Sequence, residues 1–145
     1  MTQVRIEERN GGAWAVPLGT AWISAYDLPL PDDLRRWIFG GYPENRTWVA
    51  LAPDESIVGA YLLREVLVWW RGAYRRAAIC HDVFVVPEYR RRGIFAELGR
   101  RALADAASDG IELCYAFPNA TALPGHMRVG WQDAGNVGSI PRKHL

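Results

Sequence analysis

Three consecutive arginines and a glycine, Arg90 to Gly93, stand between an apolar run and an amphipathic stretch. The run Val83–Val86 predicts a strand that Pro87 stops, and a helix is expected to begin at about Gly93. The first N–H groups of a helix have no partner within it and lie at the positive end of its dipole. Glycine leaves room for close approach, and arginines offer forked donors that suit phosphate oxygens. The turn therefore predicts a phosphate site that would accept a pyrophosphate.

Three side chains outside this turn can move protons. His81 and Asp82 stand directly before the apolar run, and His126 follows after one predicted helix and one predicted strand. Successive side chains of a strand point to opposite faces, so only one of His81 and Asp82 is expected to face a site beside the turn. Imidazole serves as acid or base near neutral pH. A half-buried histidine paired with a neighbour and an aspartate that ties down a loop are the competing interpretations.

Apolar periodicity and turn residues predict the elements that position these side chains. Strands are expected at residues 3–8, 47–52, 57–69, 74–86 and 111–117, with one last strand between 131 and 140. Helices are expected at residues 13–26, 32–39, 93–108 and 123–130. Strands and helices mixed in this order indicate an α/β (α+β) fold, in one domain that spans residues 1–145.

Composition and charge narrow the class of protein. The chain has 145 residues and a net charge of +1, and 50% of it is hydrophobic, which indicates one core without a disordered or polyanion-binding tail. A nucleic-acid-binding domain would carry a stronger basic excess. We expect a cytoplasmic protein without a membrane partner, because no signal peptide is recognisable and no apolar run reaches the ~20 residues of a membrane span. Cys80 and Cys114 lie in apolar runs that favour buried thiols, and we expect no metal.

The order of strand, proline, Arg-x-x-Gly-x-small and helix resembles the acyl-CoA-binding motif of the GNAT family of N-acetyltransferases. Here the motif reads Arg90-Arg91-Arg92-Gly93-Ile94-Phe95, and Ala96 follows. The family usually keeps glycine or alanine at the place of Phe95. We therefore expect either a wider turn or a degraded motif at this position.

A second, independent segment extends the resemblance. Asn119, Ala122, Gly130 and Trp131 fall at the places of the family's later motif, and His126 falls at the place of its tyrosine. The two segments lie in the family's order, separated by one helix and one strand. The family's sheet then closes with two strands, whereas 14 residues follow Trp131 here. Either a trimmed sheet edge or an edge completed by a partner chain, as in a homodimer, is expected, because open edges pair readily.

The resemblance implies an acyl-CoA co-substrate, most simply acetyl-CoA, and a place for each of its parts. GNAT proteins have a mixed sheet, expected here to hold about six strands with about four flanking helices. The strand before the turn splays from its neighbour, and its free backbone groups hold the pantetheine arm and the thioester oxygen. The implied donor site comprises Val83, Phe84, Val85, Arg90, Arg91, Arg92, Gly93, Ile94, Phe95, Ala96 and Asn119.

The resemblance also implies roles in catalysis. His126 would be the general acid for the departing thiolate, and a structural or substrate-binding histidine is the alternative. His81 would collect the amine proton through water, as a histidine on this strand does in some family members, and Asp82 is the second candidate. Other members use a glutamate on the following strand, where this chain has Cys114.

Aromatic residues are expected to border the acceptor site. The first two helices and the long hairpin flank this site in the family, which assigns Trp22, Tyr26 and Trp69 to acceptor binding. No acidic cluster stands ready for a polycationic acceptor. A flat or apolar small-molecule amine is therefore the expected acceptor.

The first functional hypothesis is a GNAT-type N-acyltransferase, most simply an N-acetyltransferase, that moves the acyl group directly from CoA to a small-molecule amine. The alternative is a non-catalytic GNAT-fold sensor or partner subunit that binds acyl-CoA, which Phe95, His126 and the absent glutamate favour. A nucleic-acid contact at Arg90–Arg92 is a third interpretation, and the near-neutral net charge argues against it.

Overall fold

A five-stranded mixed sheet lies at the centre of the fold. The computed structural model describes residues 4–40, 42 and 45–136. The strands are β1 (Arg5–Glu8), β2 (Asn45–Leu51), β3 (Ile57–Trp70), β4 (Ala73–Val85) and β5 (Leu113–Ala116). The helices are α1 (Ala15–Tyr26), α2 (Asp32–Phe39), α3 (Ile94–Ser108) and α4 (Leu123–Arg128), with 3₁₀ turns at Gly12–Trp14 and Pro87–Tyr89. The predicted α/β fold class is confirmed.

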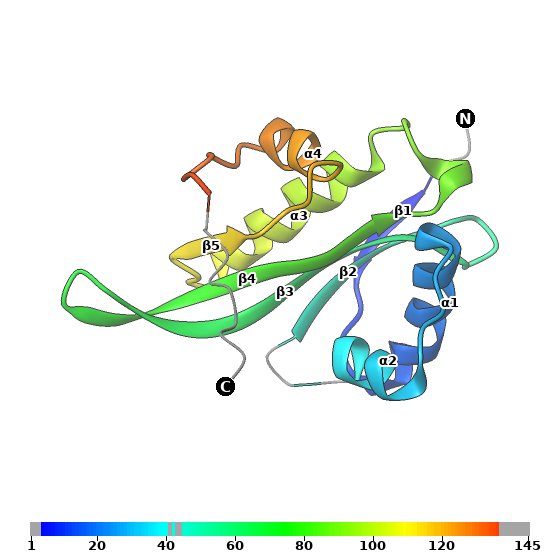
Figure 1. Cartoon of the computed structure of the whole chain (residues 1–145), viewed down its shortest axis with the longest axis horizontal. Helices are drawn as coiled ribbons and strands as arrows, with labels where there is room; N and C mark the ends of the chain where they lie inside the picture. The colour runs from blue at the N-terminus through cyan, green and yellow to red at the C-terminus, as the bar shows by residue number, and fades with distance from the viewer. Residues whose placement is uncertain (1–3, 41, 43–44, 137–145) are drawn as a thin grey trace, which may run out of the picture.

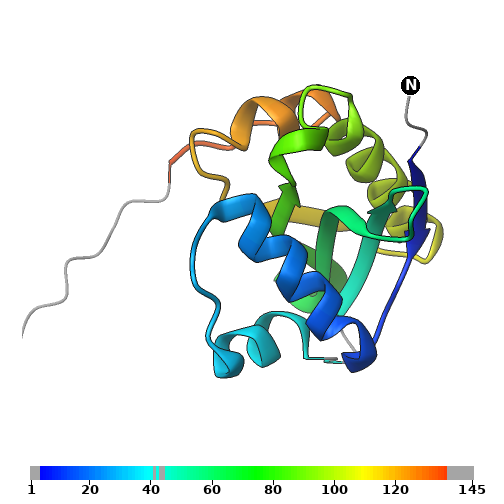
Figure 2. The same cartoon turned by 90° about the vertical axis from the view of Figure 1, so that its right-hand side faces the viewer.

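The strands follow their chain order, β1 to β5, across the sheet. The first four are antiparallel neighbours, whereas β5 is parallel to β4. A parallel neighbour requires a crossover connection, which α3 provides. Helices α1 and α2 lie on one side of the sheet and α3 and α4 on the other (Figure 1), and Figure 2 shows the same separation from the side.

Helix α3 is held on the sheet by the apolar face that the sequence predicts. Ile94, Leu98, Ala102 and Ala106 are buried along it at helical spacing. The indole N–H of the fully buried Trp48 also donates to Asp105 Oδ2 at 2.9 Å, which ties the helix to β2. Helix α3 is thereby fixed on the sheet, and its first residue, Ile94, follows the end of β4 after a short turn.

The β3–β4 hairpin extends beyond the rest of the sheet as a two-stranded arm (Figure 1). Strand β2 accompanies β3 only as far as Arg64, and β5 accompanies β4 only from Ala77 on. Trp69 lies near the tip of this arm, 64% exposed, with its ring edge-on to that of Tyr74. The structure therefore does not bring Trp69 to the end of β4, where the sequence predicts the acceptor site.

The strand predicted between residues 131 and 140 is not formed over its described part. Residues 131–136 have no regular secondary structure, and residues 137–140 lie outside the described residues. Among the described residues, β5 consequently has β4 as its one sheet neighbour, and the sheet has five strands where about six were expected.

Candidate active site

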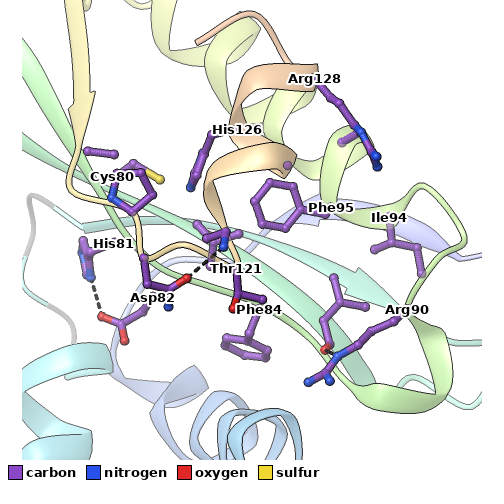
Figure 3. Close-up of a pocket in the computed structure, with 18 of the residues that line it drawn as sticks. Cys80, His81, Asp82, Phe84, Arg90, Ile94, Phe95, Thr121, His126 and Arg128 are labelled. Atoms are coloured by element: carbon purple, nitrogen blue, oxygen red, sulfur yellow. Dashed lines mark hydrogen bonds and ion pairs between the residues drawn. The ribbon is translucent and has the colours of Figure 1, made fainter. Parts of the chain in front are cut away.

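Strands β4 and β5 separate at the place where the sequence predicts a splayed pair. They pair from Ala77 with Leu113 to Cys80 with Ala116, where β5 ends, while β4 continues to Val85. A cleft of about 600 Å³ opens at this separation, between the end of β4, the first turn of α3 and α4. Figure 3 shows His81 and Asp82 on one side of it and Phe95, His126 and Arg128 on another.

The end of β4 presents backbone groups to this cleft. The N–H of Val86 donates to the carbonyl of Val58 on β3 at 2.9 Å. Because the backbone groups of successive strand residues point to opposite sides, those of Phe84 also face β3, whereas those of Val85 face away from it. The Val83 carbonyl accepts the Tyr26 hydroxyl at 3.0 Å. Of the three residues predicted to offer free backbone groups, Val83 and Val85 therefore fit through their N–H groups, because their carbonyls accept from Tyr26 and Arg90. Phe84 contributes a buried ring.

A β-bulge interrupts β4 just before this segment. Ala60 of β3 pairs with Phe84 and Leu62 pairs with His81, so a step of two residues on β3 faces a step of three residues on β4. Asp82, within this step, has a left-handed φ of 48°. The extra residue breaks the side-chain alternation of the strand. His81 Nδ1 lies 2.8 Å from Asp82 Oδ2 as a result, so the prediction that the two side chains point to opposite faces is wrong.

The Asp82 carboxylate and the His81 ring are both partly buried. The indole N–H of Trp22 on α1 donates to Asp82 Oδ1 at 3.3 Å. His81 Nε2 is shielded from solvent and has no hydrogen-bond partner among the described residues. Trp22, predicted to bind the acceptor, therefore contacts a candidate catalytic group.

The turn between β4 and α3 has the backbone shape of an anion site. Arg91 and Gly93 both have positive φ, 60° and 78°, and Ile94 begins the helix. Within the described chain, the N–H groups of residues 91–96 make no backbone hydrogen bond. The first hydrogen bond of α3 is donated by the N–H of Glu97 to the carbonyl of Gly93. A Cβ at Gly93 would meet no atom within 4 Å, so its φ is what requires glycine here. Such a run of unpaired N–H groups suits phosphate oxygens.

The three arginines of the turn have different roles. Arg90 donates to the carbonyls of Val85 at 2.9 Å and Ala25 at 2.5 Å, which ties the turn to β4 and α1. Arg92 donates to the Glu88 carbonyl at 2.7 Å and stacks over Tyr89. Arg91 is exposed and lines the cleft. Arg90 lines the cleft as well, but two of its guanidinium nitrogens are engaged by carbonyls, whereas the side chain of Arg91 makes no hydrogen bond to the described residues and can turn all of its donors to a phosphate.

A further cation, Arg128, lies across the cleft from the turn. It belongs to the last turn of α4, is exposed and lines the same cleft. Arg128 was not predicted from the sequence, because its place at the cleft depends on the packing of α4 against α3. Asn119 begins the same segment and accepts the Ala122 N–H on its Oδ1 at 2.8 Å, which fixes the start of α4.

The Phe95 side chain packs between α3 and α4. A Cβ added to Gly125 would lie 2.7 Å from Phe95 Cε1, so the ring fills the space that the glycine leaves. The ring also lies edge-on to His126, with 5.2 Å between centroids. Phe95 therefore packs against α4, and Gly125 accommodates the departure from the family's motif.

His126 is enclosed by aromatic rings at the cleft wall. It is 4% exposed, lies edge-on to Phe95, Tyr61 and Trp131, and has Nδ1 3.3 Å from the Tyr61 hydroxyl. Burial lowers the pKa of His126 below its ordinary 6.5, so the ring is neutral at neutral pH. A neutral imidazole is a weaker proton donor than imidazolium. This environment suits a packing role better than that of a charged acid.

Other cleft residues were not predicted. Cys80 and Thr121 line it, and burial raises the pKa of the Cys80 thiol to about 12, which keeps it protonated. Among the described residues, no group of three or more His, Cys, Asp or Glu side chains could hold a metal ion. None of the described helices is long and apolar enough to cross a membrane.

The chain matches one family model and resembles several solved structures. The family model for an acetyltransferase (GNAT) domain matches residues 19–134. A predicted acetyltransferase from Clostridium acetobutylicum, solved with acetyl-CoA, has a TM-score of 0.77 at 14% identity and covers 96% of each chain. The aminoglycoside N-acetyltransferase AAC(6')-Iy, solved with a bisubstrate analogue, has a TM-score of 0.76 at 14% identity, and the match covers 99% of this chain and 100% of that chain.

A third similar structure belongs to a much longer chain. It is a probable N-acyltransferase from Enterococcus faecalis, with a TM-score of 0.76 and 20% identity over 89% of this chain, which spans only 32% of that protein. At these identities the structural likeness concerns the fold. No curated protein matches the chain by sequence.

Proposed function

The chain belongs to the GNAT family of acetyltransferases, and on this premise we propose that it transfers an acyl group, most simply acetyl, from acyl-CoA to the amine of a small molecule. One observation carries the proposal. The edge of β4 that β5 leaves unpaired after Cys80 and the N–H-rich turn before α3 meet at a single cleft. A thioester on a long arm with a pyrophosphate needs both of these surfaces together.

The donor would lie along β4 with its pyrophosphate on the turn. The N–H groups of Val83 and Val85 would face the pantetheine arm and the thioester oxygen, and the turn's N–H groups with Arg91 and Arg128 would face the phosphates. Charge-assisted hydrogen bonds of this kind are shorter and stronger than neutral ones. Phe95 does not argue against this placement, because its ring packs on Gly125.

The chemical step requires a base, support for an oxyanion and a proton for the thiolate. The amine nitrogen attacks the thioester carbonyl carbon, and a backbone N–H of β4 stabilises the oxygen as it becomes negative, which is typically worth ~3 kcal/mol per donor. His81 takes the proton that the nitrogen loses. The C–S bond then breaks, and the CoA thiolate takes a proton from water or from His126.

We favour water over His126 as the proton source for the thiolate. The ring of His126 is enclosed by aromatic neighbours, and burial lowers its pKa, so it carries no excess proton at neutral pH. Proton donation by His126 is the alternative. An acid role predicts that His126→Phe lowers turnover and leaves donor affinity unchanged.

The acceptor would approach the side of the cleft formed by α1 and β4. Tyr26 of α1 and Phe117, which follows β5, both line the cleft, and Tyr26 lies edge-on to the ring of Phe84. These aromatic walls support a flat or apolar amine as the acceptor. AAC(6')-Iy, an aminoglycoside N-acetyltransferase, shares the fold at 14% identity, and its acceptor is therefore one class of amine to include in the assay of this chain.

The proposal is tested with acetyl-CoA and a panel of small amines. We expect acetyl-CoA to bind in calorimetry and free thiol to appear at a rate that depends on the amine and on its concentration. The competing function, a sensor that binds acyl-CoA without reacting, predicts binding without thiol release for every amine. No binding at millimolar acetyl-CoA would contradict both functions.

A further inference from the structure

Asp82 contacts a neighbouring histidine where strand alternation would have separated the two side chains. Its Oδ2 lies 2.8 Å from His81 Nδ1, and the two side chains are only 23% and 21% exposed. The left-handed φ of 48° at Asp82 makes this contact possible. Such a backbone conformation is uncommon outside glycine, although aspartate and asparagine adopt it more readily than most residues.

Helix α1 holds this bulge from the other side. Trp22 and Tyr26 are four residues apart and therefore lie on one face of the helix, with 4.7 Å between their ring centroids. The Trp22 N–H donates to Asp82 Oδ1 at 3.3 Å, and the Tyr26 O–H donates to the Val83 carbonyl at 3.0 Å. One carboxylate oxygen is thus engaged by α1, which leaves the other for His81.

The contact determines which nitrogen of His81 carries the proton. An ionised carboxylate only accepts hydrogen bonds, so the ring nitrogen that faces it must be Nδ1–H. A neutral imidazole in this tautomer has its lone pair on Nε2. Nε2 is buried and has no partner among the described residues, and His81 lines the cleft. An unpartnered lone pair on a histidine that lines the cleft can accept a proton, and the amine or a water molecule reaches Nε2 by displacing the side chains that cover it.

We propose that Asp82 is a positioning residue that holds His81 in the Nδ1–H tautomer, so that Nε2 can accept the proton of the acceptor amine. The inference rests on the proposed acyl transfer. As the N–C bond forms, the amine proton passes to Nε2, directly or through a water molecule, and the resulting imidazolium lies against the Asp82 carboxylate. Trp22 supports the carboxylate through its second oxygen.

The tautomer can be observed without any enzymatic assay. The chain has three histidines, so a protein labelled with ¹⁵N-histidine gives a long-range ¹H–¹⁵N spectrum of three imidazoles, and a His81→Gln sample assigns one of them. At a pH where the rings are neutral, we expect a protonated Nδ1 and an unprotonated Nε2 for His81. An Nε2–H tautomer in the unaltered protein would overturn the proposal.

Asp82→Asn is the matched perturbation. Asparagine tolerates the left-handed backbone, and its amide can donate to Nδ1, which moves the ring proton to Nε2. We expect the His81 tautomer to reverse and kcat to fall by about 10²-fold, the lower range for loss of a general base, with the Kd for acetyl-CoA unchanged. Asp33→Asn, exposed in the first turn of α2, is the control and should change neither.

Combined variants separate positioning from a merely structural role. If Asp82 acts through His81, the double variant Asp82→Asn/His81→Gln loses no more activity than His81→Gln alone. Losses that multiply would contradict the proposal. Trp22→Phe should lower kcat by about three- to tenfold, the effect of one lost hydrogen bond. A wild-type protein that releases no thiol with any amine would refute the proposed function, whereas the tautomer measurement decides the Asp82–His81 contact on its own.

Discussion

Gly125→Ala is expected to clash with Phe95 and to loosen the contact between α3 and α4. The new Cβ would lie 2.7, 2.9 and 3.0 Å from three atoms of the Phe95 ring. Carbon atoms pack best at about 3.5–4.0 Å, so the ring or the helix must move by about 1 Å. The ring has little room to do so, because it lies edge-on to both His126 and Tyr61.

The size of the effect depends on the residue at position 95. Overpacking of this kind costs about 1–3 kcal/mol, and replacing glycine by alanine within a helix returns up to about 1 kcal/mol. Gly125→Ala alone should therefore lower the free energy of unfolding by about 1 kcal/mol. In a Phe95→Leu background the clash disappears, and the same substitution should be neutral or stabilising.

Urea unfolding of the four proteins in this cycle measures the coupling between positions 95 and 125. We expect a coupling free energy of about 1–3 kcal/mol, with m-values that do not change. Gly12→Ala is the control, because its Cβ would meet the Gly40 carbonyl at an ordinary 3.6 Å. If Gly125→Ala costs the same free energy of unfolding in both backgrounds, Phe95 does not occupy the space beside Gly125.

Four other perturbations test the site. Arg91→Ala should weaken acetyl-CoA binding about tenfold in calorimetry, and the loss should be smaller at high salt. Arg90→Ala should mainly lower the urea midpoint of unfolding, because it removes two hydrogen bonds to backbone carbonyls. Burial lowers the pKa of His126, so the unfolded chain binds its proton more readily; stability should fall as pH drops through about 6.5, and His126→Phe should remove that part of the pH dependence. Cys80, with a pKa raised to about 12, should resist iodoacetamide in the folded protein and react after unfolding, as mass spectrometry would show.

The elements of the fold were predictable because their signals are local. The spacing of Ile94, Leu98, Ala102 and Ala106 predicts the buried face of α3, and Pro87 and Gly93 mark the ends of the neighbouring elements. The turn between them was predicted from glycine, arginine and the helix start. These properties depend on residues within one or two turns of chain.

The details of the site were not predictable, because they depend on residues far apart in the chain. The bulge at Asp82 is a mismatch in register between two strands, and the residues of β4 alone carry no sign of it. Phe95 and Gly125 are thirty positions apart, and only the packing of α4 on α3 shows that one makes room for the other. Arg90 likewise is bound to a carbonyl of α1.

The central claim is that the acyl-CoA donor lies on the end of β4 with its pyrophosphate on the turn before α3. Titration of ¹⁵N-labelled protein with acetyl-CoA, followed through the backbone amide resonances, tests it most directly. We expect the largest shifts at the N–H groups of Val83, Val85 and residues 91–96, the groups that face the cleft or lack a partner. Saturable shifts centred elsewhere, or no shifts at millimolar acetyl-CoA, would contradict it.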